Sequence, residues 1–215
     1  VIALSTDKAS APVNLYGATK LCADKLFISS NSLVGDSDLN FSVVRYGNVM
    51  GSRGSVIPLF MKQSKIQEYF TITDKRMTRF NITLQDAVEM VLFSINNQFP
   101  GTILVPRLPS YRITDLTEAI NKDMSIKEIG VRPGEKLHES MITSSDSYTT
   151  LDDGKYFYIA SNYEEKLKIL SDNPSLREVS ENFEYNSFNN DDFLDVNSLN
   201  RLISNLKLNK NFSID

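Results

Sequence analysis

Short apolar runs alternate with longer amphipathic stretches, and this alternation limits the folds that the chain can adopt. The apolar runs predict strands at residues 1–4, 41–46, 79–82, 103–105 and 126–131. Helical periodicity predicts helices at residues 15–31, 55–67, 84–96, 114–121 and 134–142. Strands that alternate with helices of this length favour βαβ units and a mostly parallel sheet, so the predicted fold class is α/β.

Composition excludes several classes of protein. The chain has 23 Lys and Arg against 27 Asp and Glu, a net charge of −4 that does not support nucleic-acid binding. One Cys cannot form an internal disulfide, and one His makes a metal site improbable, so we expect none. No apolar run approaches the roughly 18 residues of a membrane-spanning helix. We therefore expect a cytoplasmic protein without a membrane or nucleic-acid partner.

The beginning of the chain lacks the features of a signal peptide. Val1 opens an apolar run with no basic region ahead of it. A strand that begins on the first residue, with no preceding turn, indicates a chain entered midway. A processed N-terminus or a trimmed chain would look the same. The length of 215 residues corresponds to about one and a half domains of roughly 150 residues.

The other end changes in composition. Residues 171–195 are rich in Ser, Asn, Asp and Glu, which predicts an exposed connector. Asp195 then suits the N-cap of a short helix. Its apolar residues share one face and predict docking on the body of the protein or on a neighbouring subunit: Val196, Leu199, Leu202, Ile203 and Leu206.

The segment from residue 5 to residue 20 is the most informative. Tyr16 and Lys20 lie four apart at the start of a predicted helix, so they share a face. The strand before them ends in Ser-Thr-Asp-Lys, and ligands bind at the carboxyl edge of open α/β sheets. A free tyrosine titrates near pH 10, so a base near neutrality needs about 4 kcal/mol of phenolate stabilisation. An ammonium and a cationic nicotinamide could supply it. Outside this context, the two residues would be a surface pair.

A nucleotide-binding α/β chain should also show a Gly-rich turn after its first strand. The sequence lacks the G-x-G-x-x-G spacing, and its nearest glycines are Gly51 and Gly54. These glycines allow the backbone to approach a ligand, and Arg53 between them can pair with a phosphate. An ordinary loop with a solvated arginine explains the segment equally well.

Several motifs together resemble the extended short-chain dehydrogenase/reductases. Ser-Thr-Asp-Lys-Ala at 5–9 precedes the Tyr and Lys, and Arg-Tyr-Gly-Asn-Val at 45–49 matches the next strand of that family. Within it, residues 45–58, 72–80 and 132–139 resemble the inverting UDP-N-acetylglucosamine 4,6-dehydratases, which open pseudaminic acid synthesis. The last of these segments reads Arg-Pro-Gly-Glu-Lys-Leu-His-Glu. The matching stretches extend from about residue 1 to residue 142.

The resemblance implies a fold, a domain plan and partners. The fold would be the C-terminal part of an NAD(P)-binding Rossmann-type parallel sheet with a smaller α/β substrate-binding domain. Residues 1–55 would belong to the Rossmann domain and its catalytic segment. Residues 56–170 would form the substrate-binding region, interleaved with Rossmann elements, and residues 171–215 the connector and docking helix. The implied partners are NADP, UDP-N-acetylglucosamine and further copies of the chain in a homo-oligomer.

The resemblance also implies catalytic roles. Tyr16 would take the 4-hydroxyl proton while hydride passes to NADP⁺, Lys20 would hold the nicotinamide ribose, and Thr6 would orient the hydroxyl. Asp7 and Lys8 lie where the family places the acid and base for loss of water across C5–C6. Neighbours on a strand point to opposite faces, so this pair can serve one sugar only if the chain has left the strand. The alternative is an Asp–Lys pair on the surface.

Binding positions are carried over in the same way. Asn48 and Val56 would contact the substrate, and Thr73, Arg132 and Glu135 would surround the UDP-sugar, with Arg132 suited to the pyrophosphate. The cofactor would contact the residues that follow Asn48, namely Val49, Met50, Gly51, Ser52 and Arg53.

Three further residues are given structural roles. Asn81 replaces a large apolar or aromatic residue of these dehydratases and should affect packing. Cys22 lies in an apolar helix, and His138 is predicted to belong to a helical turn.

Two other functions remain open. A nucleotide-sugar 4-epimerase has the same fold, although epimerisation needs no C5 base, and the Asp7–Lys8 pair therefore argues against it. A non-catalytic remnant, which binds substrate or another subunit, would explain the missing Gly-rich turn.

Overall fold

The computed structural model describes residues 1–35, 37–97 and 99–208. The chain forms two compact units, each assembled from three separate segments. Unit 1 comprises Val1–Gly47, Leu84–Arg107 and Ser140–Asn186. Unit 2 comprises Asn48–Thr83, Leu108–Glu139 and Ser187–Asp215.

Unit 1 is built on a six-stranded sheet with the order β1-β2-β6-β11-β10-β12. Strands β1 (Ile2–Thr6), β2 (Ser42–Tyr46) and β6 (Thr102–Pro106) are parallel, as the alternating pattern predicts. The other half of the sheet is antiparallel, and the sequence pattern did not indicate it. Its strands are β11 (Tyr156–Ala160), β10 (Thr150–Asp152) and β12 (Arg177–Glu178).

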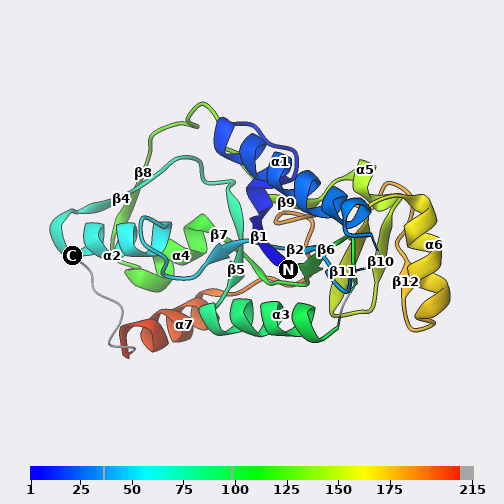
Figure 1. Cartoon of the computed structure of the whole chain (residues 1–215). Helices are drawn as coiled ribbons and strands as arrows, with labels where there is room; N and C mark the ends of the chain where they lie inside the picture. The colour runs from blue at the N-terminus through cyan, green and yellow to red at the C-terminus, as the bar shows by residue number, and fades with distance from the viewer. Residues whose placement is uncertain (36, 98, 209–215) are drawn as a thin grey trace. The chain divides into compact units, whose positions relative to one another are not determined.

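Two helices cover opposite faces of the parallel strands. Helix α1 (Leu15–Ser29) and helix α3 (Leu84–Asn96) both contact β1 and β2 and lie on opposite sides of them (Figure 1). Strand β2 is consequently buried over most of its length. Parallel strands are normally covered in this way, which makes their sequences nearly continuous apolar runs. The remaining elements of unit 1 are η1 (Asp7–Ala9), η2 (Ser30–Leu33), β9 (Ser140–Ile142), α5 (Ser144–Ser147), α6 (Tyr163–Asp172) and β13 (Tyr185–Asn186).

Unit 2 combines small sheets with three helices. Strands β3 (Asn48–Val49), β5 (Thr78–Ile82) and β7 (Ser110–Arg112) form a three-stranded sheet. Strands β4 (Tyr69–Ile72) and β8 (Ser125–Glu128) form a parallel pair. The helices are α2 (Val56–Ile66), α4 (Ile113–Ile120) and α7 (Val196–Leu208).

Helix α7 confirms the predicted docking helix. The Oδ1 atom of Asp195 accepts a hydrogen bond of 2.7 Å from the backbone N–H of Ser198, as expected of an N-cap. Leu199 and Ile203 are buried in the core of unit 2, beside Phe70 and Leu116. Residues 209–215 of the predicted terminal region lie outside the described residues.

The helix predicted at residues 134–142 is wrong. Arg132 to Glu135 form a turn in which the Glu135 N–H donates to the Arg132 carbonyl oxygen over 3.1 Å. Pro133 at the second position and Gly134, with φ +78°, at the third are typical of a type II turn. The chain then runs into β9, which pairs with β13, so His138 does not belong to a helical turn.

The connector predicted at residues 171–195 is also wrong in part. It contains β12 and β13, and it buries Leu176 and Tyr185. These few apolar anchors are too widely spaced to produce a periodic signal in a polar segment. Of the helices that the structure describes within residues 1–208, none has the length and hydropathy needed to cross a membrane.

Candidate functional site

The chain leaves strand β1 immediately before Asp7. Strand β1 ends at Thr6, and Asp7 to Ala9 form a 3₁₀ turn. The Thr6 hydroxyl donates to Asp7 Oδ1 over 2.9 Å and accepts from the Lys8 N–H over 3.4 Å. The geometric condition for Asp7 and Lys8 to serve the same molecule is therefore met, because neither residue lies on the regular strand.

Asp7 and Lys8 form an ion pair at this turn. Lys8 Nζ lies 3.0 Å from Asp7 Oδ1, and the exposed fractions of the two side chains are 32% and 0%. The Oδ2 atom of Asp7 is buried and has no hydrogen-bond partner among the described residues. A surface pair, the alternative considered above, does not describe Asp7. Lys8 is the member of the pair that reaches the surface.

Helix α1 carries both Tyr16 and Lys20, and the Lys20 side chain contacts the same strand. The side chain of Asn14 caps the helix by accepting from the Gly17 N–H over 2.9 Å. The Tyr16 side chain is exposed, which leaves its hydroxyl accessible. Lys20 Nζ donates to the carbonyl oxygen of Leu4 in β1 over 2.7 Å. The helix thus places an ammonium group beside the strand that delivers Thr6, and an exposed phenol one turn earlier on the same helix.

In unit 2, the five residues predicted to bind substrate line one pocket of about 290 Å³. They are Asn48, Val56, Thr73, Arg132 and Glu135. The type II turn brings the last two together, because it reverses the chain between them. The Oε2 atom of Glu135 is buried and has no hydrogen-bond partner among the described residues. The pocket therefore holds a carboxylate oxygen that can still accept a hydrogen bond from a ligand, given a small movement of the turn.

Arg79 also lines this pocket, and the sequence did not indicate its role. Its guanidinium donates to the carbonyl oxygens of Leu137 over 3.0 Å and Lys136 over 3.1 Å. These bonds hold the residues that follow the turn of Arg132 and Glu135. Local sequence patterns could not predict the contact of Arg79 with Lys136, because about 57 positions separate the two residues.

The predicted cofactor residues lie in the loop between β3 and α2. Met50 is packed in the core of unit 2, and Arg53 is exposed. Gly51 and Gly54 have φ values of +74° and +76°, a region that favours glycine. Among these glycines only Gly54 lines the pocket, and the segment from Val49 to Arg53 does not. Its contact with a cofactor stays a prediction.

The single histidine lies outside the predicted site residues. His138 Nδ1 is 2.9 Å from the hydroxyl of Thr78, and its ring lies 4.6 Å from that of Phe188. Burial and the nearby guanidinium groups of Arg79 and Arg76 lower the pKa of His138. The neutral imidazole is therefore the favoured form in the folded protein.

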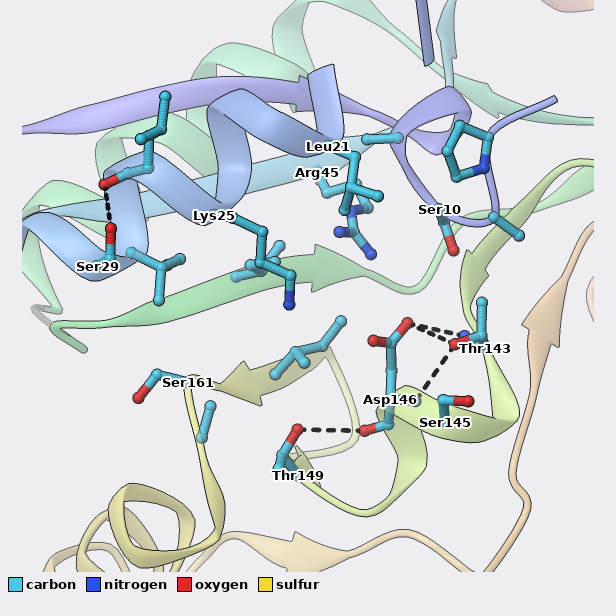
Figure 2. Close-up of a pocket in the computed structure, with 18 residues that line it drawn as sticks. Ser10, Leu21, Lys25, Ser29, Arg45, Thr143, Ser145, Asp146, Thr149 and Ser161 are labelled. Carbon is cyan, nitrogen blue, oxygen red and sulfur yellow. Dashed lines mark hydrogen bonds between the residues drawn. The ribbon is translucent and has the colours of Figure 1, made fainter. Parts of the chain in front are cut away.

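A larger cavity of about 770 Å³ lies within unit 1 (Figure 2). Helix α1 forms one wall, with Leu21 and Lys25, and the α5 turn forms another. Thr143 and Asp146 are joined there by a reciprocal capping box, which occupies the Asp146 carboxylate. None of the predicted catalytic or binding residues lines this cavity.

The fold and these side chains define a class of protein. The class is an α/β protein with part of a Rossmann-type parallel sheet, polar side chains after one strand, and a pocket with both apolar and charged lining residues in a second unit. The comparisons then give the family. The family model described as polysaccharide biosynthesis protein matches residues 1–161, and the chain belongs to this family.

Relatives of known description support the resemblance found in the motifs. The UDP-N-acetylglucosamine 4,6-dehydratase (inverting) of Campylobacter jejuni is 47% identical over 195 residues, which cover 88% of this chain and 58% of that protein. The UDP-glucose 4-epimerase of Rickettsia akari is 41% identical over 163 residues, 74% of this chain and 48% of that protein. The chain thus spans about half to three fifths of the length of these relatives.

Solved structures confirm the fold class. Pen from Bacillus thuringiensis superposes with a TM-score of 0.82 at 34% identity, over 97% of this chain and 63% of that one. The dTDP-glucose 4,6-dehydratase from Bacillus anthracis, in complex with NAD, gives a TM-score of 0.57 at 13% identity, over 98% and 62%. This second likeness shows the fold alone.

Proposed function

We propose that the chain carries the catalytic and substrate-binding parts of a nucleotide-sugar dehydratase that removes water from UDP-N-acetylglucosamine with inversion at C5. The observation that carries the proposal is the Asp7–Lys8 ion pair in the 3₁₀ turn after β1, a turn that helix α1 contacts. The identity of 47% to the Campylobacter jejuni dehydratase supports it.

The side chains of unit 1 suit the steps of this reaction. Tyr16, exposed beside Lys20, would take the proton of the 4-hydroxyl group while Thr6 orients that group. Oxidation at C4 makes the C5 proton acidic, and Lys8, in its neutral form, would remove it. Asp7, in its protonated form, would supply the proton with which the 6-hydroxyl leaves as water. Protonation of C5 by a solvent proton on the face opposite Lys8 would invert that carbon, and Lys8 would release the proton that it took to solvent.

Tyr16 and Lys20 would also hold a nicotinamide cofactor. Both side chains project from α1, and the Lys20 ammonium already donates to an oxygen acceptor, the Leu4 carbonyl, as it would to ribose hydroxyls. A nicotinamide cofactor held there would supply the hydride acceptor for C4 in its oxidised form and the hydride donor for C6 in its reduced form. The choice of NADP over NAD and the route to pseudaminic acid rest on the resemblance of the motifs. So does assembly as a homo-oligomer.

The pocket of unit 2 suits the nucleotide end of the substrate. Arg132 supplies a planar cation for the pyrophosphate. Glu135 supplies an acceptor for hydroxyl groups, because its buried Oε2 atom lacks a partner among the described residues. Asn48, Val56 and Thr73 line the same pocket with one apolar and two uncharged polar side chains.

The second candidate is a nucleotide-sugar 4-epimerase, favoured by the identity of 41% to the Rickettsia akari epimerase. The mass of the product separates the two reactions. Incubation of the chain with NADP⁺ and UDP-N-acetylglucosamine should give a product lighter by one water. A product of unchanged mass with altered C4 stereochemistry would favour the epimerase.

The Lys8→Ala variant tests the assignment of the base. We expect it to abolish loss of water while leaving the affinity for NADP⁺, measured by fluorescence titration, unchanged. Lys25→Ala, on an exposed position of α1, is the matched control and should keep wild-type turnover. Wild-type turnover in Lys8→Ala would refute the assignment. A wild-type chain that neither binds NADP⁺ nor alters the sugar would favour the non-catalytic remnant.

A further inference from the structure

We propose that Asp24 is a positioning residue that sets helix α1, with Tyr16 and Lys20, against the end of strand β1, with Thr6 and Lys8. The catalytic meaning of this inference rests on the proposed function. The structural part, that one carboxylate determines where the helix lies, rests only on contacts within unit 1.

Asp24 is a buried branch point between three elements. Its Oδ2 atom accepts a hydrogen bond of 2.8 Å from the Ser5 hydroxyl and another of 3.1 Å from Arg45 Nη2. Ser5 belongs to β1 and Arg45 to β2, so a single oxygen atom of α1 is bound to both strands. Asp24 and Arg45 are each 2% exposed, which shields the pair from water.

Arg45 extends the connection to a fourth element. Its Nη1 atom donates to the carbonyl oxygen of Met141, in β9, over 2.8 Å. Figure 2 shows Arg45 at the wall of the larger cavity of unit 1, beneath α1. With one terminal nitrogen bound to Asp24 and the other to a backbone oxygen, the planar guanidinium has little freedom to turn. The carboxylate is consequently bound to a fixed partner.

Three contacts of α1 with strand β1 and the turn that follows it come from one face of the helix. Gly17, Lys20 and Asp24 are spaced by three and four residues, so their positions line up along the helix. Gly17 packs against the Lys8 carbonyl, Lys20 donates to the Leu4 carbonyl, and Asp24 accepts from the Ser5 hydroxyl. The same helical face therefore meets the residues on both sides of Thr6.

Among these contacts, the one at Asp24 has the strictest geometry. Close packing at Gly17 limits how near α1 can come to the turn after β1, but it does not prevent the helix from sliding along that turn. The long side chain of Lys20 is flexible. A buried charged pair is weak evidence for stability, but it tolerates few arrangements, because displacement leaves charges unpaired in an apolar setting. Asp24 lies two turns beyond Tyr16, so a shift at Asp24 would be transmitted along the helix to the phenol.

Asp24→Asn tests the proposal, because asparagine keeps the shape and one oxygen but removes the charge. Residual dipolar couplings of amides in α1, β1 and β2 report the orientation of the helix relative to the strands. In the wild type, one alignment should fit all three elements. In Asp24→Asn, the α1 couplings should depart from that fit, while those in β1 and β2 still share one alignment. Lys25→Gln, on the next residue of the same helix, should leave the fit unchanged.

A second variant keeps the proposal testable if Asp24→Asn does not fold. Asp24→Leu combined with Arg45→Met removes both charges, and apolar replacement of a buried pair is often tolerated. The helix should again depart from the wild-type orientation. Wild-type α1 couplings in folded Asp24→Asn, or in the double variant if the single one unfolds, would overturn the proposal.

A turnover measurement then separates positioning from the proposed function. If the wild type dehydrates UDP-N-acetylglucosamine, Asp24→Asn should lower kcat at least tenfold and change KM less than twofold. Loss of stability alone would lower the amount of folded protein and leave kcat per folded molecule unchanged. An unchanged kcat in Asp24→Asn would therefore contradict positioning for catalysis. If the wild type shows no dehydration, the proposed function fails, and the couplings still decide whether Asp24 sets the helix.

Discussion

A methyl group added at Gly17 would come within 2.3 Å of the carbonyl oxygen of Lys8, closer than real side chains approach backbone. Helix α1 therefore lies against the 3₁₀ turn of Asp7 and Lys8 at a distance that only glycine allows. The second neighbour of the added group would be Pro12, at 3.0 Å. Both obstacles belong to the short segment that joins β1 to the helix.

Gly17→Ala should accordingly destabilise unit 1, although alanine is the better helix former. Forcing an extra carbon into a packed site typically costs about 1–3 kcal/mol. Urea unfolding followed by circular dichroism measures the change. Thr19→Ala, on an exposed position of the same helix, is the control and should change stability little. Equal stability of Gly17→Ala and wild type would show that the segment after β1 moves freely.

Truncation of the Leu199 side chain should weaken the packing of α7 against the core of unit 2. Leu199 is 0% exposed within the core of unit 2, and Leu→Ala at such sites costs about 2–5 kcal/mol. The midpoint of urea unfolding should fall for Leu199→Ala and stay constant for Asn205→Ala, which is exposed on the same helix. An unchanged midpoint for Leu199→Ala would mean that the helix contributes nothing to the core.

Stability should depend on pH through His138. Burial and two nearby arginines lower the pKa of the folded histidine below its ordinary value near 6.5. The unfolded chain therefore binds the proton first, so stability is full above about pH 6.5 and falls as pH decreases through the folded pKa. His138→Gln should lose less stability than wild type between pH 7.5 and pH 5.0, measured by urea midpoints. The variant removes the only histidine and keeps every carboxylate. Titration of Asp and Glu therefore affects both proteins, and the difference between them reports His138. Equal losses would contradict the shift.

Arg132→Gln should weaken binding of UDP to the pocket of unit 2. A hydrogen bond to a charged group contributes about 1.5–3 kcal/mol, so the dissociation constant should rise roughly tenfold or more. Isothermal titration calorimetry with UDP measures it. Arg201→Gln, on the exposed side of α7, changes charge equally and should bind as wild type does. Equal affinity of Arg132→Gln and wild type would place UDP elsewhere.

The elements with strong local periodicity were predicted well, and those that depend on distant partners were not. The strands of the parallel half and helix α7 follow from apolar runs and helical spacing. The segment after Gly134 reads as a helix in isolation, but Arg79 and the pairing of β9 with β13 extend it. Tertiary contacts with residues distant in sequence therefore override the local helix propensity of this segment.

The candidate site shows the same division. Neighbours in sequence, such as Asp7 and Lys8, could be named from the motif, and the five predicted substrate residues do share a pocket. Asp24 and Arg79 could not be assigned a role, because each acts through partners about 20 or more positions away. Rules based on the spacing of residues within one helix or strand cannot predict contacts between residues so far apart in sequence.

The interleaving of the two units has a consequence for synthesis and inheritance. Three segments of chain supply each unit, so the backbone passes between them five times. Neither unit can close from its first segment alone, because unit 1 needs residues up to 186 and unit 2 needs α7. Nor can a single recombination exchange one unit for another. Replacement of one contiguous segment would therefore separate residues that pack together within both units.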